Sequence, residues 1–396
     1  MKIAFLTAGG IAPCLSSSIG ALIEKYNHIA PDAELIGYLN GYQGLLLGRS
    51  ILFPDSVKKN YDVLHEFGGS PIGNSRVKLT NIDDCIKKGY VKEGEDPLKI
   101  AAEQLTKDGV NILHTIGGDD TNTMAAQLSF YLKENGYDLT VVGMPKTVDN
   151  DVFPVSQTLG AWTAAEQGAI FFENIVNENT TSTRQLIIHE VMGRHCGWLT
   201  AQTALDYRNR MKQRIFLPEL LVDRKKWDVD AIYLPEQDFD FKSEVHRLKK
   251  VMDDEDGVNI FLSEGAGQET IIREIESKGE VVPRDAFGHV RLDEINPGQW
   301  FAKQFAKELG ADKTLVQKSG YFARSAKANA KDLELIKKSA FFGAEQALQG
   351  KSGLAGLDDN QDSKLQLIDF ERIKGGKPFD VSLDWYKSML QEIGQH

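Results

Sequence analysis

A glycine turn that carries two carboxylates, GGDDTNT (117–123), follows the apolar segment VNILHTI (110–116). Free backbone N–H groups gather where such a turn opens a helix, here expected over 123–134 with N-cap residues just before it, and this arrangement favours phosphate. Asp119 and Asp120 would repel phosphate alone, whereas Mg²⁺ binds one or two carboxylates together with phosphate oxygens. The turn therefore predicts either a metal and phosphate site or an acidic turn that caps a helix.

A second polar cluster, PKTVDND (145–151), follows the next apolar segment, LTVVGM (139–144). It places Lys146 near Asp149 and Asp151. If both apolar segments are neighbouring parallel strands, their carboxyl ends lie at one edge of a sheet and the two clusters come together. Polar clusters that follow several strands at one edge favour a ligand site over separate turns.

The elements that must position these residues alternate between apolar strands and amphipathic helices. Strands are expected at 2–7, 33–39, 110–116 and 139–144, and helices at 15–26, 97–107 and 123–134. This alternation is typical of a doubly wound α/β unit, in which ligands bind at the carboxyl ends of the strands. Gly9 and Gly10 follow the first strand and belong to that edge. The loop 68–76 is either a solvated loop or a flexible segment that brings Arg76 to phosphate.

The composition restricts the class of protein. The chain has 396 residues, a net charge of −11 and three scattered cysteines. This length favours two domains, and the acidic charge argues against nucleic-acid or anionic-membrane partners. Cysteines without paired spacing indicate a reducing compartment, and no apolar run reaches the ~18 residues of a membrane helix. With no signal peptide at the start, the chain is expected to be cytoplasmic.

The second half of the chain has a similar alternation. Strands are expected at 184–191, 215–217 and 258–262, helices at 162–177, 197–205, 243–252 and 326–349, and a loop at 350–357. Met192-Gly193-Arg194 follows the first of these strands and Glu264 follows the last. A second α/β layer would again place such polar residues at strand ends.

Four motifs in one order, GGDDTNT, PKTVDND, MGR (192–194) and GYFAR (320–324), resemble the phosphofructokinase family from Gly9 to about Gly356. The resemblance implies an α/β fold of two doubly wound Rossmann-like domains, with the active site in the cleft between them. The larger domain would comprise 1–160 and about 320–365, and the smaller one about 161–319 and 366–396.

The resemblance also implies a role for individual residues. Asp149 would be the base that accepts the proton of a sugar hydroxyl, because such a hydroxyl is not ionised at neutral pH. Mg²⁺ would be the cofactor, with Asp119 as its ligand. The remaining catalytic residues would be Lys146, Thr147, Asp151 and Arg194. Pyrophosphate would bind Gly9, Gly10, Arg76, Gly117, Gly118, Asp120 and Lys146. The sugar phosphate would bind Thr147, Asp149, Met192, Gly193, Arg194, Glu264, Tyr321 and Arg324, with Tyr321 and Arg324 on its 6-phosphate, remote from pyrophosphate.

Two positions favour the pyrophosphate-dependent branch of the family. Nucleotide-using members carry glycine at the position of Asp120, and many carry glycine at that of Lys146. A carboxylate at position 120 would block and repel the α-phosphate of a nucleotide. The expected reaction is reversible transfer of a phosphoryl group from Mg-pyrophosphate to the 1-hydroxyl of fructose 6-phosphate. An ATP-dependent phosphofructokinase or a non-catalytic regulatory subunit are the alternatives.

Other features follow from the family or depart from it. A homodimer or homotetramer is expected. Cys14 stands in the first glycine loop where glycine is common, and a buried structural role is the simpler interpretation. An arginine that the family offers to the sugar phosphate falls one residue out of register at Arg184.

Overall fold

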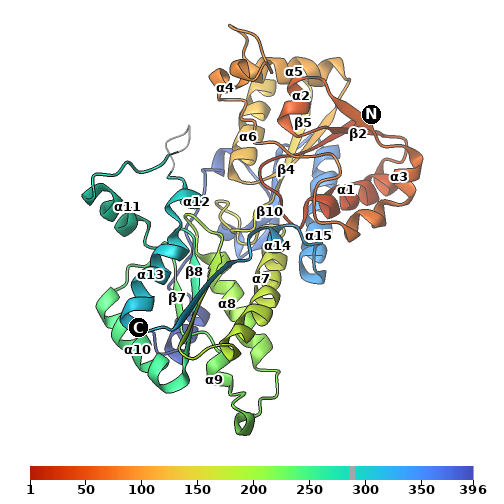
Figure 1. Ribbon diagram of the computed structural model, residues 1–396. Helices are drawn as coiled ribbons and strands as arrows, with labels where there is room; N and C mark the ends of the chain where they lie inside the picture. The colour runs from red at the N-terminus through yellow and green to blue at the C-terminus, as the bar shows by residue number, and fades with distance from the viewer. Residues whose placement is uncertain (285–289, 396) are drawn as a thin grey trace. The chain divides into compact units, whose positions relative to one another are not determined.

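The computed structural model describes residues 1–284 and 290–395, and the chain in it forms two compact units (Figure 1). The first unit consists of Met1–Ala164 and Arg324–Lys377. The second consists of Ala165–Ala323 and the segment from Pro378 onward. The chain therefore passes from the first unit into the second after Ala164, returns to the first at Arg324, and enters the second again at Pro378.

Within the described residues, the first unit contains a seven-stranded sheet in the order β11-β10-β5-β4-β1-β2-β3. Its strands are β1 (Lys2–Thr7), β2 (Glu34–Tyr38), β3 (Ser50–Leu52), β4 (Ile112–Gly117), β5 (Thr140–Pro145), β10 (Gly353–Asp358) and β11 (Lys364–Ile368). The five central strands are parallel, and β3 and β11 pair antiparallel at the two edges. Every residue of β4 is buried, as expected for a central strand covered on both faces.

Two layers of helices cover this sheet. The longer helices are α1 (Leu15–Ile29), α5 (Pro97–Lys107), α6 (Asp119–Glu134) and α15 (Ala330–Leu348), and the shorter ones are α2 (Tyr42–Leu46), α3 (Asp55–Lys59) and α4 (Ile82–Lys87). Helix α1 packs on α15, whereas α5 packs on α6 and α2. Asp96 caps α5 by accepting a hydrogen bond from the Leu98 N–H, and Pro97 occupies the first helical position. This start is why the sequence predicts α5 to the residue.

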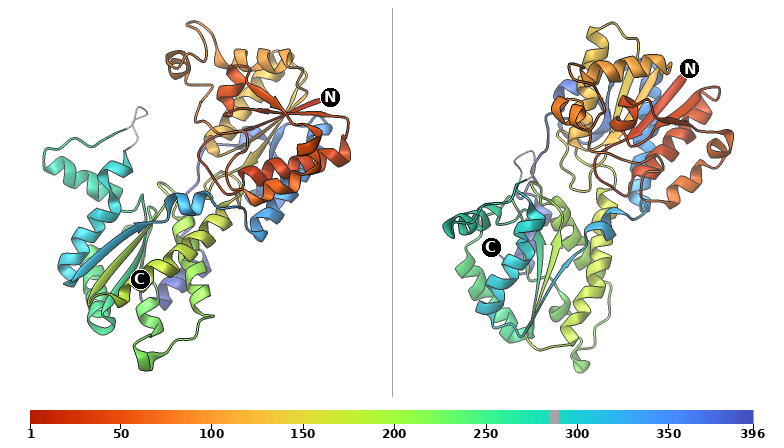
Figure 2. Two further views of the ribbon diagram at one scale, coloured as in Figure 1. Left: turned by 45° about the vertical axis from the view of Figure 1, so that its right-hand side comes forward. Right: turned by 45° about the horizontal axis from the view of Figure 1, so that its top comes forward.

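The second unit contains, in its described part, a four-stranded parallel sheet in the order β7-β8-β6-β9 (Figure 2). Its strands are β6 (Gln185–Val191), β7 (Ala231–Tyr233), β8 (Gly257–Ser263) and β9 (Lys313–Lys318). Its helices are α7 (Ala161–Ile175, which begins in the first unit), α8 (Trp198–Met211), α9 (Arg224–Trp227), α10 (Phe241–Glu255), α11 (Gln268–Ser277), α12 (Leu292–Ile295), α13 (Pro297–Leu309), α14 (Gly320–Arg324) and α16 (Asp384–Glu392). Buried aromatic rings, among them Tyr233, Phe301 and Phe305, fill the core under α10 and α13.

The predicted α/β fold class is confirmed, and two local predictions are wrong. Residues 350–357 were expected to form a loop because of their glycines, but Gly353–Asp358 is β10 and pairs with both β5 and β11. Residues 215–217 do not form a strand. Leu217 instead forms an isolated antiparallel β-bridge with Val222. Strands β9 and β11 were not predicted, because their polar residues obscure the apolar pattern.

Strand β11 also affects the division of the chain. Because β11 pairs with β10, residues 366–377 belong to the first compact unit, whereas the sequence had suggested the smaller domain. An ion pair between Arg372 and Asp358, with nitrogen to oxygen distances of 2.6 and 2.8 Å, fastens this segment to the end of β10.

The described part of the chain has no helix long and apolar enough to cross a membrane.

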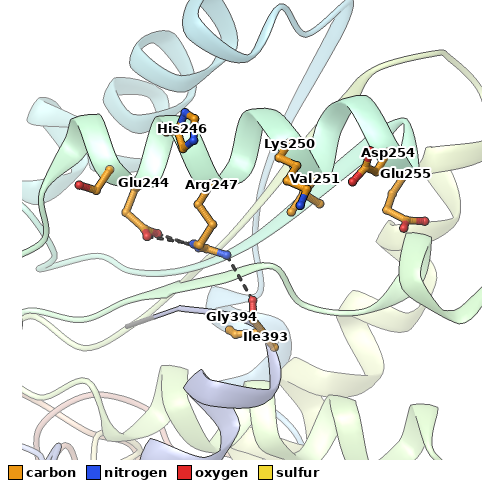
Figure 3. A pocket seen from close by; sticks show the side chains of 10 residues that line it. Glu244, His246, Arg247, Lys250, Val251, Asp254, Glu255, Ile393 and Gly394 are labelled. Atoms are coloured by element: carbon orange, nitrogen blue, oxygen red, sulfur yellow. Dashed lines mark hydrogen bonds and ion pairs between the residues drawn. The ribbon is translucent and has the colours of Figure 1, made fainter.

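The last described residues close the exposed edge of the second sheet. The Gln395 side chain accepts a hydrogen bond from the Ile232 N–H at 2.9 Å and donates one to the Ile232 carbonyl at 3.0 Å. Its amide thus takes the place of a neighbouring strand beside β7. Arg247 of α10 holds the same segment, because its guanidinium bonds both Glu244 and the carbonyl of Ile393 (Figure 3).

A buried carboxylate, Asp332 of α15, fixes the start of α7. It accepts hydrogen bonds from the backbone N–H groups of Gly160 and Thr163, at 3.0 and 2.7 Å, and from the Thr163 hydroxyl at 2.6 Å. A negative charge at a helix N-terminus is stabilised by the unsatisfied N–H groups and the helix dipole.

We predict that Asp332→Ala destabilises the protein by about 1–3 kcal/mol, because it leaves buried donors without an acceptor. Asp138 is an exposed aspartate of the same unit, so Asp138→Ala is the matched control. Thermal unfolding of both variants checks this prediction. Equal midpoints for the two variants would show that Asp332 does not hold α7.

Candidate functional site

The predicted polar clusters meet at the carboxyl edge of the first sheet. Strands β1, β4 and β5 are neighbours there, with Thr7 opposite Ile116 and Gly117 opposite Pro145. The segments that follow these strands therefore lie side by side. They contain Gly9 and Gly10, then Gly118, Asp119 and Asp120, then Lys146, Thr147, Asp149 and Asp151.

Lys146 links the three segments from a buried position, with 3% of the residue exposed. Its backbone N–H donates to the Gly117 carbonyl at 2.8 Å, and its Nζ donates to the Gly10 carbonyl at 2.7 Å. Burial lowers the pKa of its ammonium to about 8, and the charges of Arg324 and Arg76 also lower it. Three cations thus gather at one edge, which is the arrangement that an anion with several charges requires.

Arg324 lies against the first glycine loop, where its Nε donates to the Ile11 carbonyl at 2.8 Å. A Cβ on Gly10 would stand 2.5 Å from a guanidinium nitrogen of Arg324, so a side chain at this position would displace the guanidinium. The sequence had placed Arg324 on the sugar phosphate, remote from Lys146 and the pyrophosphate site. Arg324 belongs to the first unit and its charge acts on Lys146, so its guanidinium lies near the edge that carries Lys146, and its role toward the sugar phosphate stays a prediction.

The loop that carries Arg76 is fastened to the end of β1. The Thr7 hydroxyl bonds that of Ser70 at 2.6 Å and donates to the Gly73 carbonyl at 2.9 Å. The Gly9 N–H donates to the Ser75 carbonyl at 2.9 Å. These bonds hold Arg76 beside the glycine loop, so the alternative of a merely solvated loop does not describe this segment.

Helix α6 begins at Asp119, four residues before the predicted start, and Gly118 is its N-cap residue. Asn122, expected at the N-cap, lies inside the first turn. Its amide donates to the carbonyls of Gly117 and Gly118, at 2.9 and 2.8 Å, and so fixes the glycine turn.

Two partly buried carboxylates of this edge, Asp119 and Asp151, interact with each other. Burial raises the pKa of Asp151, and the charge of Asp119 raises it further. Burial also raises the pKa of Asp119, to which the charge of Asp120 contributes. Like charges in a buried place are stabilised by a divalent cation, and Mg²⁺ uses one or two carboxylates plus water and phosphate oxygens. The described residues contain no group of three or more Asp, Glu, His or Cys side chains that could hold a metal ion by themselves.

The loop around Asp149 is held by its neighbours. The Asp149 N–H donates to the Thr147 hydroxyl at 3.1 Å. Asn150 has a positive φ of 55°, and its side-chain oxygen accepts from the Thr158 N–H at 2.8 Å. The Thr158 hydroxyl donates to the Thr147 carbonyl at 2.9 Å. Asn150 was missing from the predicted site, although an asparagine between two aspartates at a turn could have indicated it.

Asp120 has a partner that the sequence did not indicate. Its carboxylate pairs with Lys78 Nζ at 2.8 Å, and both side chains are partly exposed. Lys78 lies two residues after Arg76, so the same loop brings one cation to the centre of the edge and another to Asp120.

The second unit has its own polar edge. Met192, Gly193 and Arg194 follow β6, and Glu264 follows β8, where its N–H donates to the Val191 carbonyl at 2.9 Å. Gly193 has a φ of 130°, and a Cβ there would meet the Cys196 carbonyl oxygen at 2.3 Å.

A cavity of about 410 Å³ adjoins this edge, and Arg194 is one of the residues that line it. Other lining residues are His195, Phe239, Gln268 and Trp300. Tyr321 of α14 is largely exposed. Predicted sugar-binding residues of this unit therefore include Arg194 beside a cavity and Tyr321 at the surface.

Arg184 lies at the opposite, amino end of β6. Its guanidinium bonds the carbonyls of Leu309 and Gly310 and pairs with Asp253 at 2.9 Å. Within this chain Arg184 is thus kept away from the carboxyl edge. A further cavity of about 580 Å³, between α10 and the C-terminal segment, is also separate from the predicted residues (Figure 3).

Comparison with known proteins shows the family to which the chain belongs. The family model described as phosphofructokinase matches residues 2–345. A protein of Methylomonas methanica and one of Methylotuvimicrobium alcaliphilum, both named pyrophosphate–fructose 6-phosphate 1-phosphotransferase, are 59% and 57% identical over 394 residues, which cover 100% of this chain and 96% of each relative. A solved pyrophosphate-dependent phosphofructokinase from Marinobacter aquaeolei matches 100% of this chain and 92% of its own, with a TM-score of 0.71 and 20% identity. That likeness supports the fold alone.

The lowered pKa of Lys146 gives a prediction about pH. If its ammonium binds an anionic substrate, kcat/KM for that substrate should fall as the pH rises through about 8, because the free enzyme then loses this proton. Lys146→Arg should keep the charge and move this decline to higher pH. Steady-state kinetics from pH 6 to 10 check this, with Lys133→Arg, an exposed lysine of α6, as control. A decline at the same pH in all three proteins would exclude Lys146 as its cause.

Proposed function

Because the chain belongs to the phosphofructokinase family, we propose that it transfers a phosphoryl group from Mg-pyrophosphate to the 1-hydroxyl of fructose 6-phosphate. The products are fructose 1,6-bisphosphate and phosphate. The two phosphoryl compounds differ modestly in transfer potential, so the reaction runs in both directions.

The observation that carries the choice of donor is Asp120, paired with Lys78 at the first turn of α6. By family resemblance, this carboxylate occupies the space of a nucleotide α-phosphate. Pyrophosphate lacks that phosphate and needs no such space. Lys78 explains how a carboxylate can stand beside an anionic donor, because the ion pair neutralises Asp120 at 2.8 Å.

The chain supplies the donor site through cations and backbone N–H groups. Lys146, Arg76 and Arg324 provide positive charge at the carboxyl edge of the first sheet, and Gly118 opens α6 toward it. Positioned charge of this kind is the main contribution of a protein to phosphoryl transfer. Asp119 and Asp151 would hold Mg²⁺, which supplies charge to the phosphate oxygens when bound.

Asp149 acts as the base. Its carboxylate accepts the proton of the 1-hydroxyl as that oxygen attacks phosphorus, and its backbone is fixed by Thr147. In the second unit, Met192, Gly193, Arg194, Glu264 and Tyr321 bind the sugar phosphate. Asp119, Asp149 and Arg194 are all present, which favours an active enzyme over a regulatory subunit that binds without turnover. The three free thiols support the cytoplasm as its compartment.

We predict turnover with pyrophosphate and none with ATP. Formation of fructose 1,6-bisphosphate from each donor, with Mg²⁺ present, tests the proposal directly. Asp120→Gly should at least partly restore nucleotide binding, because it removes the blocking carboxylate. A comparable kcat/KM for ATP in the unaltered protein would show that the choice of donor is wrong. Asp149→Ala is the inactive control, with an expected loss of ~10²–10⁴-fold in kcat and little change in sugar-phosphate binding.

The ion pair of Asp120 gives a separate prediction. Lys78→Met should raise KM for pyrophosphate on the order of fivefold, because it exposes the donor to an unneutralised carboxylate, and partly exposed pairs contribute up to about 1 kcal/mol. The double variant Lys78→Met with Asp120→Asn should recover the original KM. Lys88→Met removes a similar lysine, paired with Asp84 at 2.8 Å, and serves as control. If the double variant is as impaired as Lys78→Met alone, Lys78 does not act through Asp120.

A further inference from the structure

The segment 193–197 joins β6 to α8 and brings Arg194 to the cavity at the carboxyl edge of the second sheet. The Ser263 hydroxyl, at the end of β8, donates a hydrogen bond to the Gly193 carbonyl at 2.6 Å. A Cβ on Gly265 would stand 1.9 Å from the Arg194 carbonyl oxygen, so the turn after β8 packs directly on the backbone of Arg194. Residues that follow β8 therefore hold the beginning of this segment.

The end of the segment is held from a different strand. Glu236 lies in the turn after β7, and its Oε1 accepts a hydrogen bond from the Gly197 N–H at 2.8 Å. Gly197 is the N-cap residue of α8, it has no side chain to cap the helix, and the first turn of α8 contains no acidic residue. In a capping box, a glutamate of the helix itself bonds the N-cap N–H. Glu236 makes this bond from another element.

The same carboxylate is fixed by the C-terminal segment. The Phe379 N–H donates to Glu236 Oε1 at 2.7 Å, and the Tyr386 hydroxyl donates to the side-chain oxygen of Gln237 at 2.7 Å. The rings of Phe379 and Tyr386 pack edge to face, with centroids 5.3 Å apart. One oxygen atom of Glu236 thus joins the C-terminal segment to the start of α8.

The other oxygen of Glu236 shows how closely the carboxylate fits. Oε2 is buried and has no hydrogen-bond partner among the described residues. A Cβ on Gly197 would stand 2.7 Å from it, so Oε2 lies against the backbone of the N-cap residue. Glu236 and Arg194 both line the cavity of about 410 Å³. The carboxylate is therefore held beside the Arg194 segment by its two backbone donors.

The segment is wound too tightly for its end to move alone. A Cβ on Gly193 would stand 2.3 Å from the Cys196 carbonyl oxygen, so the first and fourth residues of the segment are in contact. Arg194 lies between these two residues. A displacement of Gly197 is consequently passed to Arg194, three residues earlier.

We propose that Glu236 is a positioning residue for Arg194 and thereby raises the affinity for fructose 6-phosphate. The inference rests on the proposed function, in which Arg194 binds the sugar phosphate. Glu236 acts through the Gly197 N–H. A guanidinium whose backbone is already fixed loses less freedom when the substrate binds, so more of its interaction energy appears as affinity.

Steady-state kinetics of the full chain with both substrates varied test the proposal. Glu236→Ala should raise KM for fructose 6-phosphate on the order of tenfold, because Gly197 loses its acceptor, and leave KM for pyrophosphate within about twofold. Glu236→Gln keeps an oxygen acceptor and should restore KM for fructose 6-phosphate to within about threefold of the unaltered value. Asp223→Ala removes the side-chain cap of α9 in the same unit and is the control for the loss of a cap alone.

A cycle of variants with Arg194 separates positioning from general stability. Arg194→Ala should weaken the binding of fructose 6-phosphate, measured by calorimetry, and the addition of Glu236→Ala should weaken it by no more than about a further twofold. Full multiplication of the two effects would show that Glu236 does not act through Arg194. An unchanged KM in Glu236→Ala, or a Glu236→Gln protein as impaired as Glu236→Ala, would also overturn the proposal.

Hydrogen exchange gives a readout that needs no substrate. Glu236→Ala should accelerate exchange of the amides of residues 193–197 on the order of tenfold, because their segment opens more often, whereas Glu236→Gln and Asp223→Ala should not. Unchanged exchange in Glu236→Ala would refute the positioning role. An unaltered protein that neither binds nor phosphorylates fructose 6-phosphate would instead refute the proposed function, so the two failures are distinguishable.

Discussion

The buried ammonium of Lys146 is the interaction on which the carboxyl edge of the first sheet depends. Three loops from three strands meet there, and Lys146 bonds two of them from the third. The backbone N–H of Lys146 bonds the β4 end, and its Nζ bonds the β1 loop. Burial of a charge is costly, as its lowered pKa shows. An anion placed at this edge would relieve that cost.

Burial shifts the pKa of the carboxylates at this edge in the opposite direction, because it again disfavours the charged form. Asp119 and Asp151 are each made less acidic by burial and by a neighbouring negative charge. Cations and anions thus lie at one edge in separate groups, rather than neutralising each other completely. A ligand that carries both a divalent metal and several phosphate oxygens, as the proposed reaction uses, would satisfy both groups together.

The sequence predicted those parts of the fold and site that depend on local chemistry. Helix α5 has an aspartate cap and a proline start, and the polar clusters directly follow apolar strands, so both could be read from neighbouring residues. Strand β10 was missed because its pairing with β5 and β11 is not local, and its glycines resemble a turn. Lys78 and the contact between Arg324 and Ile11 were missed for a similar reason, since each cation meets a partner from a distant loop.

The Gln395 amide at the edge of β7 has a consequence for how the protein is made. Its partner Ile232 lies 163 residues earlier in the chain. Until residue 395 has left the ribosome, the N–H and carbonyl of Ile232 at the outer edge of β7 lack this partner, and other chains can bind such edge groups. The first unit likewise lacks β10 and β11 until residue 368 is made. Neither unit can finish folding before most of the other has been synthesised, so assembly of the two is coupled in time and the nascent chain is exposed to aggregation for much of its synthesis.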